Sequence, residues 1–559
     1  MTGIKVIRRD TAHDARVVAE IAAVTQTGEI ARASEMARAA LDGGLINPMF
    51  LTLRAWWHEQ HGRSADALAD LRLALSLDSR DLKVRNPLGI LLGRLGHWSD
   101  AVALMEETAR LSPDQAEPWF NLGWAREFTG ELQEARRCFE QAAALDPLFA
   151  APLAHLASLA YRRADWDAAE DFAGKALVIE PQQPVALTAL AMTALARGDF
   201  AATETRLAQL GDLSRLEPTE AALAQTALGD LRDAQGRHAE AFAAYAARNA
   251  RKFREAAGQF DRPGNTTTDY VNWLTAYFTA APADWGAVPD ETPPDSRDGA
   301  IGHVFLVGFP RSGTTLLENV LASHPRVAAL DERDTLGEAA MAFLSGEEGR
   351  AQFAAIGPAE IQAHRAIYWQ RVRRFGAHVE GKVFLDKYPL SSIKLALVAK
   401  LFPDAKILFA LRDPRDVLLS CFRRSFSLNP SMFELLDLER GARLYAAVMT
   451  LSMLYRQKLG LGWHMLRYES LVGDFEGEVR RACDFIGLEW DERMQDFAAL
   501  SRTRTIKTPS SIQVVRGLYR EGAGQWRAYA SQLAPAIAIL EPWIRRFGYE
   551  VESAAASRP

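Results

Sequence analysis

At 559 residues the chain is too long for a single hydrophobic core, so we expect at least two domains. Its 48% apolar and 24% charged residues are ordinary for a globular protein, and a net charge of −6 argues against a protein that coats nucleic acid. No uninterrupted apolar stretch reaches membrane-spanning length, and the start lacks the apolar segment of a signal peptide. The scattered cysteines, Cys138, Cys421 and Cys483, predict buried free thiols in a reducing, cytoplasmic setting.

The first half of the chain repeats with a period of 34 residues. Ala164 occupies one slot of this series, and glycine fills the others at Gly28, Gly62, Gly96, Gly130 and Gly198. Small residues recur five positions after these slots, at Ala33, Ala67, Ala101, Ala135, Ala169 and Thr203. This period, with small residues where two helices cross, is the signature of the tetratricopeptide repeat, and it predicts an α-helical solenoid over residues 1–278.

The last copy of the repeat is out of phase by four residues, which predicts an inserted loop near residues 211–218. A stretch rich in Pro and Asp follows and is expected to be an extended linker, residues 279–299. A second domain is expected over residues 300–550, followed by a flexible tail, residues 551–559.

The second domain opens with a strand, a glycine-bracketed loop and a helix. The apolar run Val304–Val307 ends at the loop 308–315, after which apolar residues recur at helical spacing. Such a junction aims backbone N–H groups and the positive end of the helix dipole at one point, which favours an anion. The loop has the GxxxxG frame of a P-loop, but Thr314 stands where an NTPase has Lys, and Arg311 supplies a cation from within the loop.

A second basic segment follows another apolar run, Ile407–Leu411. Asp413 is expected to cap the next helix, with Pro414 at its first position. Arg412 ends the strand. Ser420 and Arg424 are expected within this helix, four residues apart and so on one face, and the three side chains could converge on a second phosphate.

Together the two segments resemble the donor-binding motifs of sulfotransferases that use 3′-phosphoadenosine 5′-phosphosulfate (PAPS). With the repeats included, the chain resembles the bacterial tetratricopeptide-repeat sulfotransferases, its catalytic half being similar to tyrosylprotein sulfotransferases. The resemblance implies a P-loop-like α/β domain with a central parallel sheet. It assigns the 5′-phosphosulfate to Arg311, Ser312, Gly313, Thr314 and Thr315, and the 3′-phosphate to Arg412, Ser420 and Arg424.

Two further nucleotide contacts are expected from the same resemblance. Tyr468 heads a Tyr-Glu pair that lies beside the nucleotide in the family, although a half-buried tyrosine at a strand end is an equal alternative. Residues 508–529 resemble a loop that folds over the cofactor, with Ser510, Gln513, Tyr519 and Trp526 matching its pattern. Gly517 stands where proline is usual, and Arg516 is the candidate basic contact.

Sulfuryl transfer to a hydroxyl needs a base, donors for the SO₃ oxygens and a cation for the departing phosphate. The distance in sequence from Arg311 to Glu332 equals that from the loop arginine to the catalytic glutamate in tyrosylprotein sulfotransferases. Glu332 is therefore the expected general base, with Asp331 and His324 as less favoured candidates. Lys387, in a DK-x-P element, and Arg311 are the expected electrostatic catalysts. No metal site is expected from the sequence.

We therefore expect a PAPS-dependent sulfotransferase whose leading acceptor is a protein or peptide tyrosine, with a glycan or small-molecule hydroxyl as the alternative. The repeats are expected to dock the acceptor or a protein partner. A kinase or NTPase is disfavoured by Thr314. A scaffold with a catalytically silent second domain is the remaining alternative. Nucleic acid is not an expected partner, and no membrane span is expected.

Overall fold

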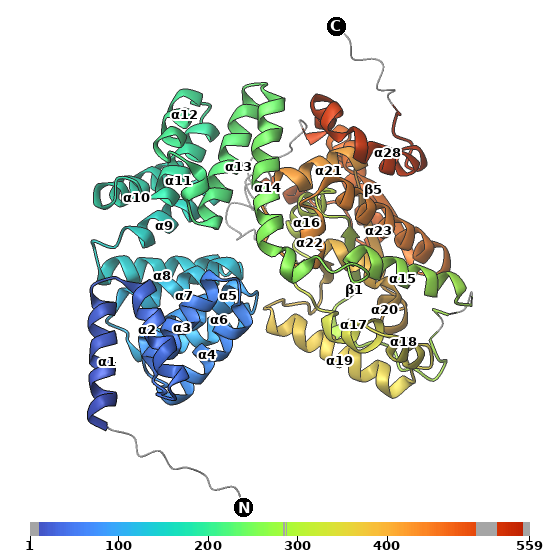
Figure 1. The fold of residues 1–559 in the computed structure, drawn as a ribbon. Helices are drawn as coiled ribbons and strands as arrows, with labels where there is room; N and C mark the ends of the chain where they lie inside the picture. The colour runs from blue at the N-terminus through green and yellow to red at the C-terminus, as the bar shows by residue number, and fades with distance from the viewer. Residues whose placement is uncertain (1–10, 283–284, 287, 499–521, 552–559) are drawn as a thin grey trace, which may run out of the picture. The chain divides into compact units, whose positions relative to one another are not determined.

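The computed structural model describes residues 11–282, 285–286, 288–498 and 522–551. Its contacts divide the chain into two compact units, residues 1–159 with 167–186 and residues 160–166 with 187–559. The first unit is wholly helical, and the second contains both further helices and a parallel β-sheet. The predicted order of a helical repeat region followed by an α/β domain is confirmed (Figure 1).

The repeat region is a series of helices joined by short turns, drawn from blue to green in Figure 1. The helices are α1 (Thr11–Gln26), α2 (Ile30–Asp42), α3 (Pro48–Gln60), α4 (Ser64–Leu77), α5 (Leu82–Arg94), α6 (Trp98–Leu111), α7 (Ala116–Phe128), α8 (Leu132–Leu145), α9 (Ala150–Arg162), α10 (Trp166–Ile179), α11 (Pro184–Ala196), α12 (Phe200–Gln209), α13 (Pro218–Ala234), α14 (His238–Phe260) and α15 (Thr267–Ala280). The phase slip coincides with a shortened α12 and a 3₁₀ turn at Leu213–Arg215.

The residues that mark the repeat act as turns and crossing points. Each glycine of the 34-residue series has a positive φ at the turn between two helices, and Ala164 takes the same conformation at φ 58°. A Cβ at Gly123 of α7 would lie 2.7 Å from the Phe139 ring of α8, so only glycine allows this close approach. The small residues five positions after the slots are fully buried.

The second unit has a five-stranded sheet in which every pair of neighbours is parallel. Its order is β2-β3-β1-β4-β5, with β1 Gly302–Gly308, β2 Val327–Asp331, β3 Val383–Lys387, β4 Lys406–Leu411 and β5 Gly462–Arg467. Strands β2 and β3 lie on one side of β1, and β4 and β5 lie on the other, so the strand order reverses beside β1. Ligands of open α/β sheets bind beyond the carboxyl ends of the strands at such a reversal.

Helices cover both faces of this sheet, which explains its continuous apolar strands. Side chains alternate between two cores, with Val304 and Leu306 in one and Phe305 and Val307 in the other. The helices are α16 (Thr314–Ala322), α17 (Gly337–Leu344), α18 (Glu347–Ala354), α19 (Pro358–Arg374), α20 (Leu395–Leu401), α21 (Pro414–Arg423), α22 (Pro430–Glu434), α23 (Leu438–Lys458), α24 (Tyr468–Gly473), α25 (Phe475–Ile486) and α28 (Ala530–Arg546).

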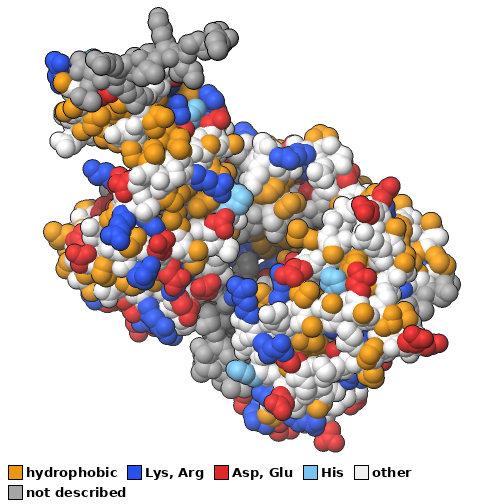
Figure 2. Space-filling view, turned by 90° about the horizontal axis from the view of Figure 1, so that it is seen from below, with side chains coloured by type: hydrophobic (Ala, Val, Ile, Leu, Met, Phe, Trp, Pro, Cys, Tyr) orange, Lys and Arg blue, Asp and Glu red, His pale blue; other side chains and the backbone are white. Residues whose placement is uncertain are grey.

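The surface carries charges of both signs. On the face seen in Figure 2, basic and acidic side chains are interspersed and do not gather into a patch of one sign. Among the described residues no helix is long and apolar enough to cross a membrane. The three cysteines are free and buried, as the sequence predicts.

Candidate functional site

The loop after β1 takes a conformation that its sequence makes possible. Gly308 must be glycine because a Cβ there would lie 2.6 Å from the Ala410 carbonyl of the neighbouring strand. Gly313 has φ 100°, and Arg311, which has a side chain, has φ 70°. A non-glycine residue in this region is uncommon and is held there only by its surroundings. The loop therefore presents the Arg311 side chain at the cost of backbone strain.

Helix α16 begins directly after this loop. Its N-cap is Gly313, and the side chains of Ser312, Thr314 and Thr315 are buried around its N-terminal end. The Ser312 hydroxyl is a buried polar atom with no protein hydrogen-bond partner. The N-terminal end of a helix, with its dipole and its N–H groups, and this hydroxyl together suit an anion.

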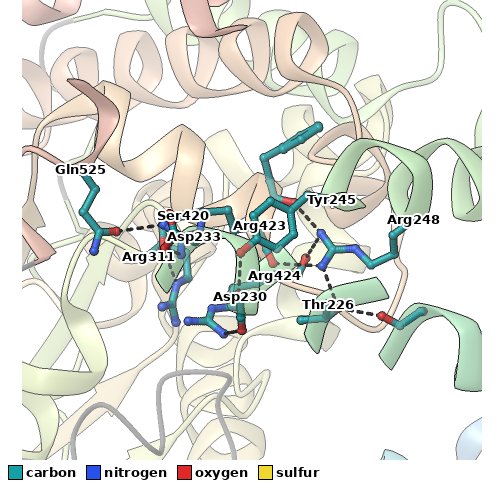
Figure 3. Close-up of polar contacts among 12 residues, drawn as sticks. Thr226, Asp230, Asp233, Tyr245, Arg248, Arg311, Ser420, Arg423, Arg424 and Gln525 are labelled. Carbon is teal, nitrogen blue, oxygen red and sulfur yellow. Dashed lines mark hydrogen bonds and ion pairs between the residues drawn. The ribbon is translucent and has the colours of Figure 1, made fainter. Parts of the chain in front are cut away.

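Three arginines, Arg311, Arg412 and Arg424, form what we call the arginine end of the site. The Arg311 Nε donates to the Ser420 hydroxyl at 3.0 Å (Figure 3). Arg412, at the end of β4, donates to the Arg311 carbonyl at 3.1 Å. The structure thus brings the loop arginine together with the residues that the sequence assigns to a second phosphate.

Helix α21 starts as predicted and ends one residue early. Asp413 is its N-cap and accepts from the Arg415 N–H at 2.9 Å, with Pro414 at the first position. The helix ends at Arg423, and Arg424 is extended, with φ −101° and ψ 142°. The prediction that Ser420 and Arg424 lie within one helix is therefore wrong for Arg424. The carbonyls of Phe422 and Arg423 accept hydrogen bonds from Arg248 of α14, and not from the next turn of α21.

The arginine end concentrates positive charge. Burial is the main cause that lowers the pKa of Arg311, to about 9, and Arg424 and Arg412 lower it further. Glu332 is near enough to act in the opposite direction. Like charges held together in a buried site favour the binding of an anion, which relieves their repulsion.

Tyr468, the first residue of α24, packs against the loop. The Arg412 guanidinium lies over its ring, 4.9 Å from the centroid. A Cβ at Gly313 would lie 2.9 Å from the Tyr468 ring, and one at Gly522 would lie 2.5 Å from its hydroxyl. Tyr468 is buried and belongs to a core cluster, so it supports the loop whether or not it contacts a nucleotide.

The C-terminal segment reaches the same place. Arg412 donates to the Gly522 carbonyl, and the N–H groups of Gly524 and Trp526 donate to Asp416 of α21 at 2.6 and 2.8 Å. The Arg415 guanidinium covers the Trp526 ring at 3.6 Å. The predicted contact Arg516 lies outside the described residues, as do its neighbours Ser510, Gln513 and Tyr519.

Lys387 and three carboxylates form the lysine end of the site. Lys387 ends β3, where it is in register with Asp331 of β2. Its ammonium pairs with Asp331, with Glu332 Oε1 at 2.9 Å and with Glu318 Oε2 at 3.6 Å. Burial alone would lower the pKa of Lys387, but Glu332, Asp331 and Glu318 outweigh it and raise the pKa well above its ordinary value.

Glu332 is the accessible carboxylate of this group. About a third of its side chain is exposed, 36%, whereas Lys387 is fully buried. Its N–H donates to the Lys387 carbonyl at 2.8 Å, and its φ is 45°. Two of the predicted site residues, Arg311 and Glu332, are thus in strained backbone conformations, a feature that clusters at functional sites.

The rival base His324 lies elsewhere. It follows the C-terminal end of α16, about 13 Å of helix from the N-terminal end. Its Nδ1 accepts from the Arg326 N–H at 3.0 Å, and burial lowers its pKa. This histidine stabilises the turn after α16.

Sequence reasoning missed Glu318. It follows Thr314 by four residues and so lies on the same face of α16, directed at Lys387. A lone acidic residue in the apolar run LLENVL was the available signal. Within the described part of the chain, no group of three or more His, Cys, Asp or Glu side chains is arranged to hold a metal ion.

Family models match both parts of the chain. Residues 303–492 match the sulfotransferase family, and residues 116–149 match the tetratricopeptide repeat. The first match includes Arg311, Glu332, Lys387, Arg412 and Ser420.

The chain also resembles curated proteins. It is 27% identical over 256 residues to an uncharacterized protein of Aquifex aeolicus, covering 44% of this chain and 33% of that protein. It is 23% identical to protein-tyrosine sulfotransferase A of Caenorhabditis elegans, covering 44% of this chain and 67% of that protein. Among solved structures, the sulfotransferase domain of a Synechococcus olefin synthase is 22% identical, with a TM-score of 0.33, over 47% of this chain and 98% of the other. The chain thus spans only a third of the Aquifex relative.

Proposed function

We propose, for a chain whose residues 303–492 form a sulfotransferase-family domain, that the protein moves a sulfuryl group from PAPS to an acceptor hydroxyl. The observation that carries the proposal is the meeting of Arg311 with Ser420 at 3.0 Å. This contact joins the anion-binding loop to the second basic segment, so one ligand with two anionic ends can be held by both.

The described residues fit such a donor. The N-terminal end of α16, with Arg311 and the buried Ser312 hydroxyl, suits the 5′-phosphosulfate. Arg412, Ser420 and Arg424 suit the 3′-phosphate, since Arg412 has a buried Nε without a protein partner. Thr314 replaces the lysine that an NTPase uses for the β- and γ-phosphates, which disfavours ATP chemistry.

The lysine end supplies the proton chemistry. PAPS provides an activated sulfuryl group with a phosphate as its leaving group. Glu332 accepts the proton of the acceptor hydroxyl, since it is the carboxylate of this group most open to solvent. Lys387 orients Glu332 through their 2.9 Å contact and, with Arg311, offsets the negative charge that develops on the phosphate.

The acceptor that we propose is a tyrosine hydroxyl in a peptide or protein. Support comes from the relative named protein-tyrosine sulfotransferase A and from the repeats, because solenoids of this kind present extended surfaces for binding. Docking of the acceptor on the repeats is part of the same proposal.

The experiment is transfer from ³⁵S-labelled PAPS by the purified full chain. Acceptors are a tyrosine peptide, its Phe counterpart, an oligosaccharide and a small phenol, and mass spectrometry locates the label. We expect label on the tyrosine peptide alone. Label on the oligosaccharide or phenol alone would reject the tyrosine assignment and keep the donor chemistry. MgATP turnover without any sulfuryl transfer would reject both.

A matched pair of variants tests the base. Glu332→Gln should lower transfer about 10²–10⁴-fold while 3′-phosphoadenosine 5′-phosphate (PAP) still binds. Asp331→Asn, its neighbour on the same lysine, should lower transfer less. If the larger loss belongs to Asp331→Asn, the base is Asp331.

A further inference from the structure

The C-terminal end of α21 lies next to the arginine end of the site. Ser420 is in its last turn, and Arg424 follows it directly. The final carbonyls of a helix lack intrahelical partners and carry the negative end of the helix dipole. Such an end repels a phosphate, so a phosphate site beside it needs these carbonyls to be neutralised.

Helix α14, the second helix of the last repeat, supplies the neutralising groups. Arg248 is fully buried, and its guanidinium donates to the carbonyls of Phe422 at 2.6 Å and Arg423 at 3.0 Å. The Asn249 side chain donates to the same Phe422 carbonyl at 3.0 Å. Lys252, one turn further along, donates to the Phe426 carbonyl at 2.7 Å. Arg248 and Asn249 thus take the place of missing helical partners of α21, whereas Lys252 bonds a carbonyl beyond the end of that helix. Figure 3 shows Arg248 at this position.

Helix α13 holds the arginines that follow. Asp230 lies 3.7 Å from the Arg424 guanidinium and accepts from the Tyr245 hydroxyl at 2.6 Å. Asp233 pairs with Arg423. Arg248 itself is fixed by Thr226 of α13, whose hydroxyl lies at 2.9 Å. Figure 3 draws these contacts together with the hydrogen bond between Arg311 and Ser420.

We propose that the last helix pair of the repeats, α13–α14, is part of the nucleotide site, with Arg248 and Asn249 as positioning residues for the 3′-phosphate. They act through α21, by neutralising its C-terminal end and by holding Ser420 and Arg424 in place. Burying a guanidinium completely is costly unless its charge is compensated, and the α21 carbonyls provide that compensation. The inference rests on the proposed function, because the 3′-phosphate belongs to PAPS and PAP.

The test compares PAP with 5′-AMP, which lacks the 3′-phosphate. Calorimetric titration of the full-length wild type should show a clear preference for PAP. Arg248→Met should lower PAP affinity about tenfold and leave 5′-AMP affinity unchanged, so the preference falls by the same factor. Arg248→Lys, which keeps the charge, should retain part of the preference for PAP. A purely structural role would weaken both nucleotides alike.

Arg251 provides the matched control on the same helix. Its guanidinium also bonds carbonyls, those of Leu213 and Leu216, but these belong to the turn before α13 and not to α21. Arg251→Met should leave the preference for PAP unchanged.

Each remaining outcome is decisive. An unchanged preference in folded Arg248→Met overturns this inference and leaves the proposed function standing. If that variant does not fold, Asn249→Ala replaces it, with an expected loss of about threefold, and an unchanged preference there overturns the inference equally. A wild type that does not prefer PAP overturns the proposed function together with this inference.

Discussion

The arginine end and the lysine end of the candidate site each bring charged side chains close together, yet their charges are balanced in opposite ways. Burial is the main cause that lowers the pKa of Arg311, and the neighbouring charges of Arg424 and Arg412 lower it further. Around Lys387 the neighbouring charges are carboxylates, and its pKa is raised. The arginine end is therefore suited to take up an anion from outside, whereas at the lysine end carboxylates of the protein already surround the cation. Under the proposed function, this difference separates nucleotide binding from proton transfer within one site.

Lys387→Met tests the lysine end and has the largest expected effect on the free energy of unfolding. It leaves Glu318, Asp331 and Glu332 together without their cation, so the free energy of unfolding should fall by about 3–5 kcal/mol, measured by urea unfolding at pH 7.5. Lys394→Met is the control, because Lys394 pairs with the half-exposed Asp334 at 2.7 Å and should cost less than about 1 kcal/mol. Equal losses in the free energy of unfolding in the two variants would contradict the claim that Lys387 offsets the charge of the three carboxylates.

Asp386→Asn sharpens the contrast on the opposite face of the same strand. Burial raises the pKa of Asp386 to about 6, although Thr335 and Tyr368 donate to its Oδ2 at 2.6 and 2.7 Å. A carboxyl whose pKa is raised on folding stabilises the protein below its ordinary value near 3.8, and this contribution is lost as the pH rises through 6. Ionised Asp386 then lowers the free energy of unfolding at pH 8 by up to about 3 kcal/mol.

Asparagine keeps the acceptor without the charge, so Asp386→Asn should be stabilising at pH 8 and close to neutral at pH 4. Urea unfolding at both pH values is the measurement. The exposed Asp404, on the same unit, is the control, and Asp404→Asn should change the free energy of unfolding by less than about 0.5 kcal/mol at either pH. A gain of Asp386→Asn that does not depend on pH would refute the charge-based explanation.

Arg412→Ala tests the arginine end. PAP affinity should fall about 10–100-fold, because a hydrogen bond to a charged group is lost, and 5′-AMP affinity should fall less. We expect the loss to be larger in binding than in the free energy of unfolding, the reverse of Lys387→Met. Calorimetric titration and urea unfolding of the same preparation measure both. Unchanged PAP affinity in Arg412→Ala and in Ser420→Ala would remove the second phosphate from this end.

Gly313→Ala has the smallest expected effect. A Cβ at φ 100° is strained, and here it also meets the Tyr468 ring at 2.9 Å, so the free energy of unfolding should fall by about 1–2 kcal/mol. Gly376→Ala, at φ 84° with nothing within 4 Å of its Cβ, has the strain alone. Thermal unfolding of both variants isolates the Tyr468 contact. If the two variants lose the same stability, the Tyr468 ring moves away from the added Cβ without measurable cost.

Local patterns were enough to predict the repeats and the loop. The 34-residue period follows from turns and crossings that each repeat makes within itself, as Gly123 against Phe139 shows. The loop and the cap Asp413 likewise depend on a few adjacent residues. Contacts between distant segments could not be predicted in this way, and Glu318 at Lys387 is an example.

By itself the sequence determined the helical repeats and the residue types of the loop 308–315, because backbone conformation and burial follow from spacing along the chain. The parallel sheet was implied by the resemblance to sulfotransferases. Only the tertiary structure decided the partners of each charge. Strand register sets Asp331 beside Lys387, and packing of α14 sets Arg248 at the end of α21. Electrostatic energies depend on distance and burial in space, and neither can be read from position in the sequence.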